Sequence, residues 1–135
     1  MKGKMKSQKG FTLIELVLVI TILGILAVAA LPQFIDVSTD AAEASRDGVV
    51  GAIREGISLY RANDLVQNGP PGDYPASLGG ADGDASGTNM LFSTIMEQGV
   101  GDPSWNQAGD TYVYTNGVVT STYAYDSATG AFTEQ

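Results

Sequence analysis

The strongest constraint on this chain is a run of apolar residues near its N-terminus, from position 11 to position 31. Within this run only Glu15 carries a charge. A helix rises about 1.5 Å per residue, so the run gives roughly 31 Å of helix, enough to cross the hydrocarbon core of a bilayer. Four lysines and no acidic residue precede it. Because positively charged flanks stay in the cytoplasm, we expect a single-pass segment with its N-terminus inside and the rest of the chain outside.

Glu15 is the unusual residue of this run. A carboxylate at mid-bilayer costs about 2.5 to 3.5 kcal/mol or more, so an ionisable group inside a span indicates function. Glu15 lies four residues after Phe11, roughly 6 Å along a helix, which places it near the inner face and lowers the cost. Taken alone, Glu15 is equally well interpreted as an edge residue that reaches for the headgroups.

The residues around Glu15 are far more specific together than the glutamate alone. A short lysine-rich leader ends at Gly10, and Phe-Thr-Leu-Ile-Glu follows from Phe11. The long apolar stretch behind it contains Gly24 and Pro32. This segment, about a fifth of the chain, resembles the N-terminus of type IV pilins and related pseudopilins. The resemblance implies that a membrane-embedded prepilin peptidase cuts between Gly10 and Phe11. It also implies that the new N-terminal Phe11 is N-methylated and that Glu15 helps subunits assemble.

Gly24 and Pro32 bracket a weak section of this helix. Proline removes a backbone donor and clashes with the preceding turn, and glycine costs about 1 kcal/mol relative to alanine. Apolar spacing resumes beyond Pro32, which favours continuation of the helix over an end there. Pilins of similar sequence carry a proline in a long helix that is kinked or locally unwound. The resemblance therefore implies a helix break between these two residues in the filament.

An ordinary secretory signal is the alternative interpretation of the N-terminus. Ala27-Val28-Ala29 offers a small-residue cleavage pattern. Against it, the apolar run is longer than a signal core of about 7 to 15 residues, and a glutamate inside that core would be odd. With such a signal, the chain would be an exported ligand-binding module rather than a filament subunit.

The composition excludes several classes of function. The chain has 15 acidic and 7 basic residues, and all four lysines lie in the leader. A chain that starts at Phe11 therefore sets three arginines against 15 acids, a side-chain charge of −12. Such a body repels nucleic acid and anionic headgroups, so we expect no nucleic-acid partner. Histidine and cysteine are absent, which removes the usual general bases, thiol nucleophiles, soft metal sites and disulfides, so we predict no enzyme.

Beyond the anchor, the sequence predicts an α+β fold, in which the outer half of one long N-terminal helix packs on a small antiparallel sheet. A helix with one apolar face needs a partner layer, and the C-terminal half should supply it. The apolar face consists of residues at helical spacing, namely Ala42, Val49, Ile53, Ile57 and Tyr60. The expected boundaries are a leader at 1–10, a transmembrane and assembly helix at 11–32, an amphipathic helix at 33–63, a loop at 64–110 with a short helix at 89–98, and a sheet at 111–135.

The tail reads as β-structure. Residues 111–115 alternate and are rich in aromatic and branched side chains, and Asn116-Gly117 is a strong hairpin signal. Further strands are expected at 118–125 and 131–133, which gives a meander of three or four strands laid across the helix. Trp105 is expected to be a half-buried anchor of the preceding loop. Tyrosines at strand spacing pack in a core or at a sheet edge more often than they form a ligand surface, so we expect a packing role for those of the tail. These are Tyr112, Tyr114, Tyr123 and Tyr125.

The loop also contains an acidic turn. Residues 82–87 match the first half of a calcium-binding loop, with Asp82, Asp84 and Ser86 as the candidate ligands. The twelfth position is Ser93 rather than a bidentate glutamate, and no flanking helix pair is evident. We therefore expect an unliganded acidic turn and no cofactor, with calcium as a secondary hypothesis. Pseudopilins of type II secretion, which the N-terminus also resembles, do bind calcium in the head.

By the resemblance, the chain is expected to be a structural subunit of an extracellular type IV pilus, with roles in adhesion or motility. Its helices would bundle into the core of a homo-oligomeric filament and its heads would tile the surface, the head being loosely similar to pilins of the mannose-sensitive haemagglutinin kind. The resemblance implies four partners: the prepilin peptidase, the pilus motor, the assembly platform and an outer-membrane pore. The prepilin would first reside in the inner membrane. The alternative within the same machinery is a type II secretion pseudopilin, which forms a short periplasmic piston.

Overall fold

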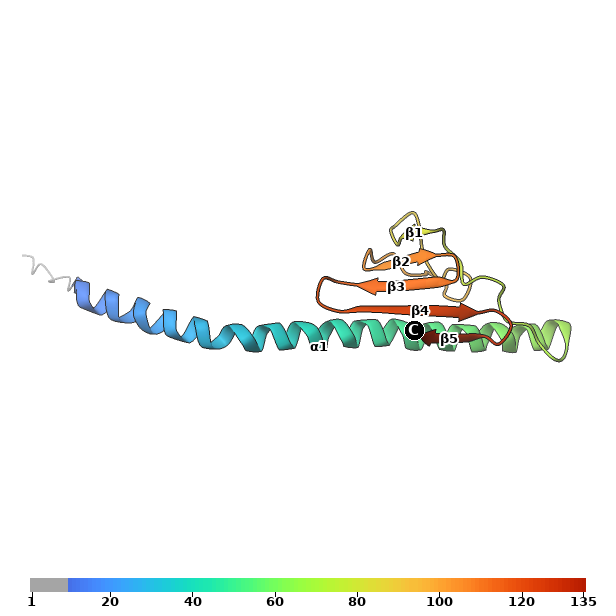
Figure 1. Cartoon of the computed structure of the whole chain (residues 1–135), viewed down its shortest axis with the longest axis horizontal. Helices are drawn as coiled ribbons and strands as arrows, with labels where there is room; N and C mark the ends of the chain where they lie inside the picture. The colour runs from blue at the N-terminus through green and yellow to red at the C-terminus, as the bar shows by residue number, and fades with distance from the viewer. Residues whose placement is uncertain (1–9) are drawn as a thin grey trace, which may run out of the picture. The chain divides into compact units, whose positions relative to one another are not determined.

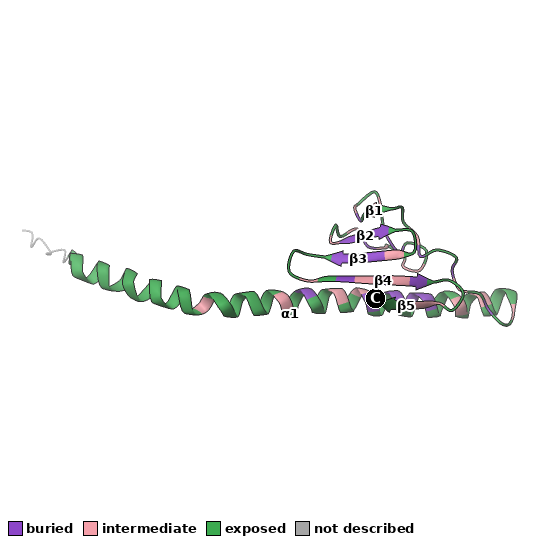
Figure 2. Ribbon diagram, in the orientation of Figure 1, coloured by how far each residue is buried: buried purple, intermediate pink, exposed green. Residues whose placement is uncertain are grey.

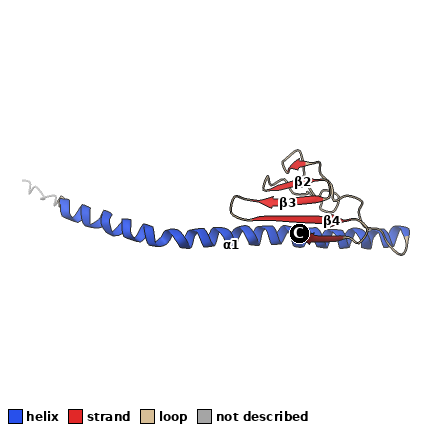
Figure 3. Ribbon diagram, viewed as in Figure 1, coloured by secondary structure: helices blue, strands red, loops and turns tan. Residues whose placement is uncertain are grey.

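The computed structural model describes residues 10–135 (Figure 1). The chain forms two compact units, Met1–Val37 and Ser38–Gln135. Helix α1 contributes to both units. Figure 3 shows how helix and strands follow one another along the chain. The elements are α1 (Leu13–Asn68), β1 (Gly83–Asp84), β2 (Trp105–Ala108), β3 (Thr111–Thr115), β4 (Thr120–Asp126) and β5 (Ala131–Glu134).

In the first unit, α1 is the only element among the described residues, and its side chains are exposed almost throughout (Figure 2). Phe11 is 95 % exposed, and the leucines, isoleucines and valines that follow it are exposed as well. An isolated subunit therefore leaves an all-round apolar helix without a protein partner. Such a helix is stable only in lipid or against other apolar helices.

The second unit is a helix packed on one antiparallel sheet, so the predicted α+β class is confirmed. The five strands follow in sequence order, β1-β2-β3-β4-β5, each antiparallel to the next. Sequence analysis predicted three or four strands, because β1 and β2 lie in the stretch that was assigned to loop. In the register of the sheet, Tyr112 lies opposite both Gln107 and Tyr123, and Tyr125 lies opposite Phe132.

The core of this unit lies between α1 and the sheet. Alternate residues of β3 and β4 point into it, so the four tail tyrosines are buried and their predicted role in packing is confirmed. Trp105 is only 1 % exposed and begins β2, so it is a core residue rather than the half-buried loop anchor that was expected. Phe92 sits among these rings, 5.6 Å from Trp105 and 4.8 Å from Tyr112 between centroids. Burial of each such ring contributes about 1.5 to 3 kcal/mol.

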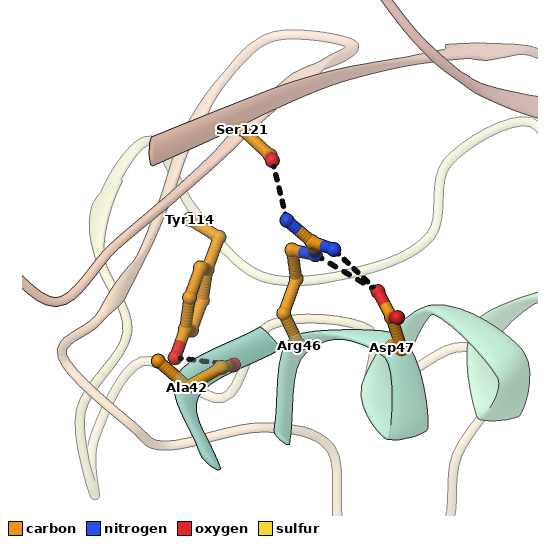
Figure 4. Close-up of polar contacts among 5 residues, drawn as sticks. All are labelled: Ala42, Arg46, Asp47, Tyr114 and Ser121. Atoms are coloured by element: carbon orange, nitrogen blue, oxygen red, sulfur yellow. Dashed lines mark hydrogen bonds and ion pairs between the residues drawn. The ribbon is translucent and has the colours of Figure 1, made fainter. Parts of the chain in front are cut away.

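Hydrogen bonds add to this packing on the polar edge of α1 (Figure 4). Tyr114 donates its hydroxyl to the carbonyl oxygen of Ala42 at 3.3 Å. Arg46 donates to Ser121 Oγ of β4 at 3.0 Å and forms an ion pair with Asp47 at 2.8 Å. One turn of α1 is thus attached to two adjacent strands.

The amphipathic helix ends at Asn68, five residues later than predicted. Asp64 begins the stretch that was assigned to loop. In the structure, Asn63 and Asp64 accept hydrogen bonds from the side chains one turn ahead, Gln67 and Asn68. Gly69 then takes a φ of 85° and donates its N–H to the carbonyl of Leu65, which ends the helix in the usual glycine-assisted way.

The short helix predicted at 89–98 does not form. Phe92 has a φ of 61°, which no α-helix allows, and it is placed there because its ring fills the core. The N–H groups of Phe92 and Thr94 are donated to the carbonyls of Gly79 and Leu78 instead of to a preceding helical turn. The segment is a tight turn closed by a bridge between Leu91 and Val100.

Candidate functional site

The first candidate site is the start of α1. The helix begins at Leu13, so Thr12 is its N-cap and Glu15 is its third residue. Glu15 Oε2 accepts a hydrogen bond from the Thr12 N–H at 2.8 Å and one from Thr12 Oγ1 at 2.9 Å. In return, the Glu15 N–H donates to Thr12 Oγ1 at 3.3 Å. This reciprocal arrangement is a capping box, which satisfies two backbone donors at a helix start.

The capping box has two consequences for Glu15. Its carboxylate is anchored to its own chain through one oxygen, so the side chain is held in a fixed place at the helix start. Oε1 makes no hydrogen bond with any described residue, so this oxygen remains available to an outside donor. Sequence analysis did not single out Thr12, although the spacing Thr-x-x-Glu before an apolar run is a recognised start signal for a helix.

The predicted cleavage site lies directly before this box. Gly10 and Phe11 precede the helix and both are exposed. The lysine-rich part of the predicted leader, residues 1–9, lies outside the described residues. Cleavage and methylation at Phe11 stay predictions.

The apolar segment behind Glu15 meets the length requirement for a membrane span. α1 contains one stretch long and apolar enough to cross a bilayer, and none of that stretch is buried within the protein. Gly24 and Pro32 both lie inside α1, which is helical without interruption through this section of the single chain. The predicted break concerns the filament, so it stays a prediction.

The second candidate site, the acidic turn, is engaged in holding the sheet. Asp82 Oδ1 accepts the Gly109 N–H at 2.8 Å, and Asp84 Oδ1 accepts Asn106 Nδ2 at 2.9 Å. Ser86 Oγ accepts the Asn89 N–H at 3.1 Å. Residues 83 and 84 form β1, so the segment is an edge strand rather than a flexible turn. Between Gly10 and the C-terminus, no three acidic side chains gather in a way that could hold a metal ion.

Comparison with known proteins bears on the first site. Residues 5–31 match the family model described as the prokaryotic N-terminal methylation motif. The chain is 33 % identical over 116 residues to the type IV narrow pilus major component PilA5 of Thermus thermophilus, an alignment that covers 84 % of this chain and 92 % of that protein. It is 32 % identical over 100 residues to a fimbrial protein of Pseudomonas aeruginosa, covering 70 % of this chain and 65 % of that protein.

A secretion protein is also similar, at lower identity. The type II secretion system core protein G of Pseudomonas aeruginosa is 27 % identical over 107 residues, covering 77 % of this chain and 63 % of that protein. The chain thus spans about two thirds of the length of both Pseudomonas relatives. No solved structure matches the chain.

Proposed function

The chain belongs to the type IV pilin family, and we propose that it is a structural subunit of an extracellular pilus, polymerised through the N-terminal half of α1. The observation that carries this proposal is the exposed apolar helix that starts with a single, positioned carboxylate. The higher identity to pilus proteins than to the secretion protein supports a pilus over a secretion piston. If filaments sheared from the cell surface lack this subunit, the alternative of a type II secretion pseudopilin would be favoured instead.

The proposed processing follows from the place of Gly10. A prepilin peptidase in the inner membrane cuts the bond between Gly10 and Phe11 and leaves Phe11 with a free amine, which is then methylated. The subunit waits as a single-pass membrane protein with its N-terminus on the cytoplasmic side. The assembly platform, the motor and the outer-membrane pore act on it afterwards.

We propose that Glu15 sets the axial position of each subunit relative to its neighbours in the filament. The core of a filament of apolar helices holds little water, so burying the Phe11 amine alone or the Glu15 carboxylate alone would cost several kcal/mol. Pairing the two offsets both costs. Because Thr12 occupies only Oε2, Oε1 can accept the amine of a neighbouring subunit while the capping box stays in place. A helix that slips along its axis loses this pair, so the pair sets the axial position of each subunit.

The test is a Glu15→Ala subunit expressed in place of the native one. We expect insertion and cleavage to continue, so intact-mass analysis of the membrane fraction shows a subunit that begins at Phe11. Filament assembly should fail, as seen by electron microscopy of the cell surface. Glu43→Ala, which removes an exposed carboxylate from the same helix in the second unit, is the matched control and should assemble normally.

Two results would contradict this assignment, and a third would contradict the proposed cleavage at Gly10. Normal filaments built from the Glu15→Ala subunit would show that register does not depend on the carboxylate. Loss of cleavage in that variant would move the role of Glu15 from assembly to recognition by the peptidase. An intact mass that corresponds to a subunit starting near residue 30 would instead favour cleavage as an ordinary secretory signal.

A further inference from the structure

The chain contains two Asn-Gly dipeptides, Asn68-Gly69 and Asn116-Gly117. A glycine leaves its backbone nitrogen open to close approach, because it has no side chain to shield that nitrogen from the amide carbon of the preceding asparagine. The nitrogen can attack this carbon and displace ammonia, a reaction called deamidation, wherever the local structure lets the two groups meet. The structure holds the two dipeptides in different ways, so we expect them to differ in reactivity.

Asn68 is held in an unreactive arrangement. It is the last residue of α1, and its Nδ2 donates a hydrogen bond to Asp64 Oδ1 at 2.6 Å. The N–H of Gly69 donates to the carbonyl oxygen of Leu65 at 3.1 Å. The attacking nitrogen and the side-chain amide would both have to leave these bonds before they could react.

Asn116 lies in the loop at 116–119, which joins β3 to β4. Its side-chain Oδ1 accepts the N–H of Val118 at 3.1 Å and the N–H of Val119 at 3.0 Å. Because both donors come after Gly117 in the chain, these bonds fold the amide of Asn116 back over the Gly117 nitrogen. The Gly117 N–H itself donates to no described residue, and Asn116 and Gly117 are both exposed to water.

The two hydrogen bonds to Oδ1 also favour the reaction itself. Attack by the Gly117 nitrogen places negative charge on Oδ1 as the carbonyl carbon becomes tetrahedral. Two backbone N–H groups that already point at this oxygen stabilise such a charge, as the donors of an oxyanion hole do. The reacting groups belong to one closed loop, so little freedom is lost in bringing them together.

We propose that Asn116 is a site of spontaneous deamidation, with water as the co-reactant. The Gly117 nitrogen loses its proton to solvent hydroxide and forms a bond to Cγ of Asn116. The Cγ–Nδ2 bond then breaks, and ammonia leaves with a proton taken from water, which gives a cyclic succinimide. Water opens this ring at Cγ to give aspartate, or at the main-chain carbonyl carbon to give isoaspartate. Either product adds one negative charge to the loop between β3 and β4.

The test follows both dipeptides in the full subunit, kept in detergent and mildly alkaline buffer. Pepsin then cuts the chain in acid, where the attacking nitrogen stays protonated, and mass spectrometry measures the conversion of each asparagine to the acid. We expect Asn68 to react at least about tenfold more slowly than Asn116, because two hydrogen bonds must break first. The product at position 116 should include isoaspartate, which fragmentation by electron transfer distinguishes from aspartate and which direct hydrolysis of the amide does not form.

Two kinds of control separate the effect of the fold from that of the dipeptide. In guanidinium chloride that unfolds the second unit, both dipeptides should react at similar rates, because the same two residues are then free in each place. Asn116→Gln should abolish the main product, since the longer side chain would have to close a larger ring. Asn68→Gln, the matched replacement at the other dipeptide, should leave that product unchanged.

The proposal is overturned if Asn116 stays intact for as long as Asn68, or if the acid formed at position 116 contains no isoaspartate. A difference between the two dipeptides that persists in the unfolded subunit would also overturn it, because the loop would then not be the cause. The reaction needs only the loop and water, so each of these results leaves the proposed pilus function standing.

Discussion

At the scale of single residues, the start of α1 shows how one side chain serves folding and assembly together. Thr12 closes the helix start and at the same time fixes the position of the Glu15 carboxylate. A freely rotating glutamate would lose side-chain entropy on entering a filament contact. In this chain the ordering has already occurred in the single subunit, so Thr12 acts as a positioning residue for the proposed pair.

Replacing Thr12 by alanine should therefore impair assembly without preventing it. Thr12→Ala removes the N-cap side chain, which costs about 1 kcal/mol of helix stability, and frees Glu15 to rotate. We expect faster amide exchange at residues 13–15 of the subunit in detergent and fewer filaments per cell. Thr12→Ser keeps the cap and should behave as the native chain. If the alanine variant shows the faster exchange but still forms as many filaments as the native chain, the Thr12 cap is not needed for assembly.

At the scale of elements, α1 carries glycines of two kinds in the second unit. A Cβ on Gly56 would lie 2.7 Å from the carbonyl oxygen of Ile95, so only glycine lets the turn after Phe92 approach the helix this closely. Gly48 and Gly51 face open space, with nothing within 4 Å of an added Cβ. Sequence analysis cannot separate these cases, because all three are equally poor helix formers.

The difference is measurable by a pair of alanine substitutions. Gly51→Ala should stabilise the isolated subunit by about 1 kcal/mol through helix propensity alone. Gly56→Ala gains the same propensity but must push back the backbone at Ile95, so a net loss of about 1 to 3 kcal/mol is expected. Thermal melting of the detergent-solubilised subunit measures both. Equal stabilisation by the two substitutions would show that the turn at Ile95 yields without cost.

At the scale of the whole molecule, the buried tyrosines set an alkaline limit on stability. Burial raises the pKa of Tyr112 from 10.0 to about 12, because the phenolate cannot be solvated in the core. Burial likewise raises the pKa of Tyr125 to about 12. A raised pKa in the fold means that the folded state binds more protons than the unfolded state between pH 10 and 12. The stability of the fold is thus fully present below that window and is lost as the pH rises through it.

An alkaline titration tests this limit. The native subunit should unfold as the pH rises from about 10 to 12, with phenolate absorbance appearing together with loss of secondary structure. Tyr112→Phe removes a buried hydroxyl that has no partner, so it should be neutral or stabilising at pH 7 and should shift alkaline unfolding upward. Tyr60→Phe, at a residue that is 38 % exposed, is the control; it should change neither the stability at pH 7 nor the pH of alkaline unfolding. Unfolding that Tyr112→Phe leaves unmoved would contradict the assigned cause.

The sequence by itself determined the anchor, the fold class and the strand pattern of the tail. Each of these rests on a periodicity that local chemistry enforces: a continuous apolar run, a helical stripe, and alternation around Asn116-Gly117. The motif around Gly10, Phe11 and Glu15 was equally readable, because its residues are adjacent in the chain. The side chains that alternate along β3 and β4 are buried for the same reason.

Only the tertiary structure decided the features that depend on distant segments. The stretch at 89–98 has a helical pattern, yet burying Phe92 among Trp105 and Tyr112 stabilises more than one short helix would, so the backbone turns there instead. β1 and β2 are strands because each finds a partner, although their sequence lacks alternation. The hollow beside Arg61 exists only because the loop at Tyr74 and the turn at Ser127 come together beside α1. Local sequence specifies which structure a segment prefers, and long-range burial decides whether it adopts it.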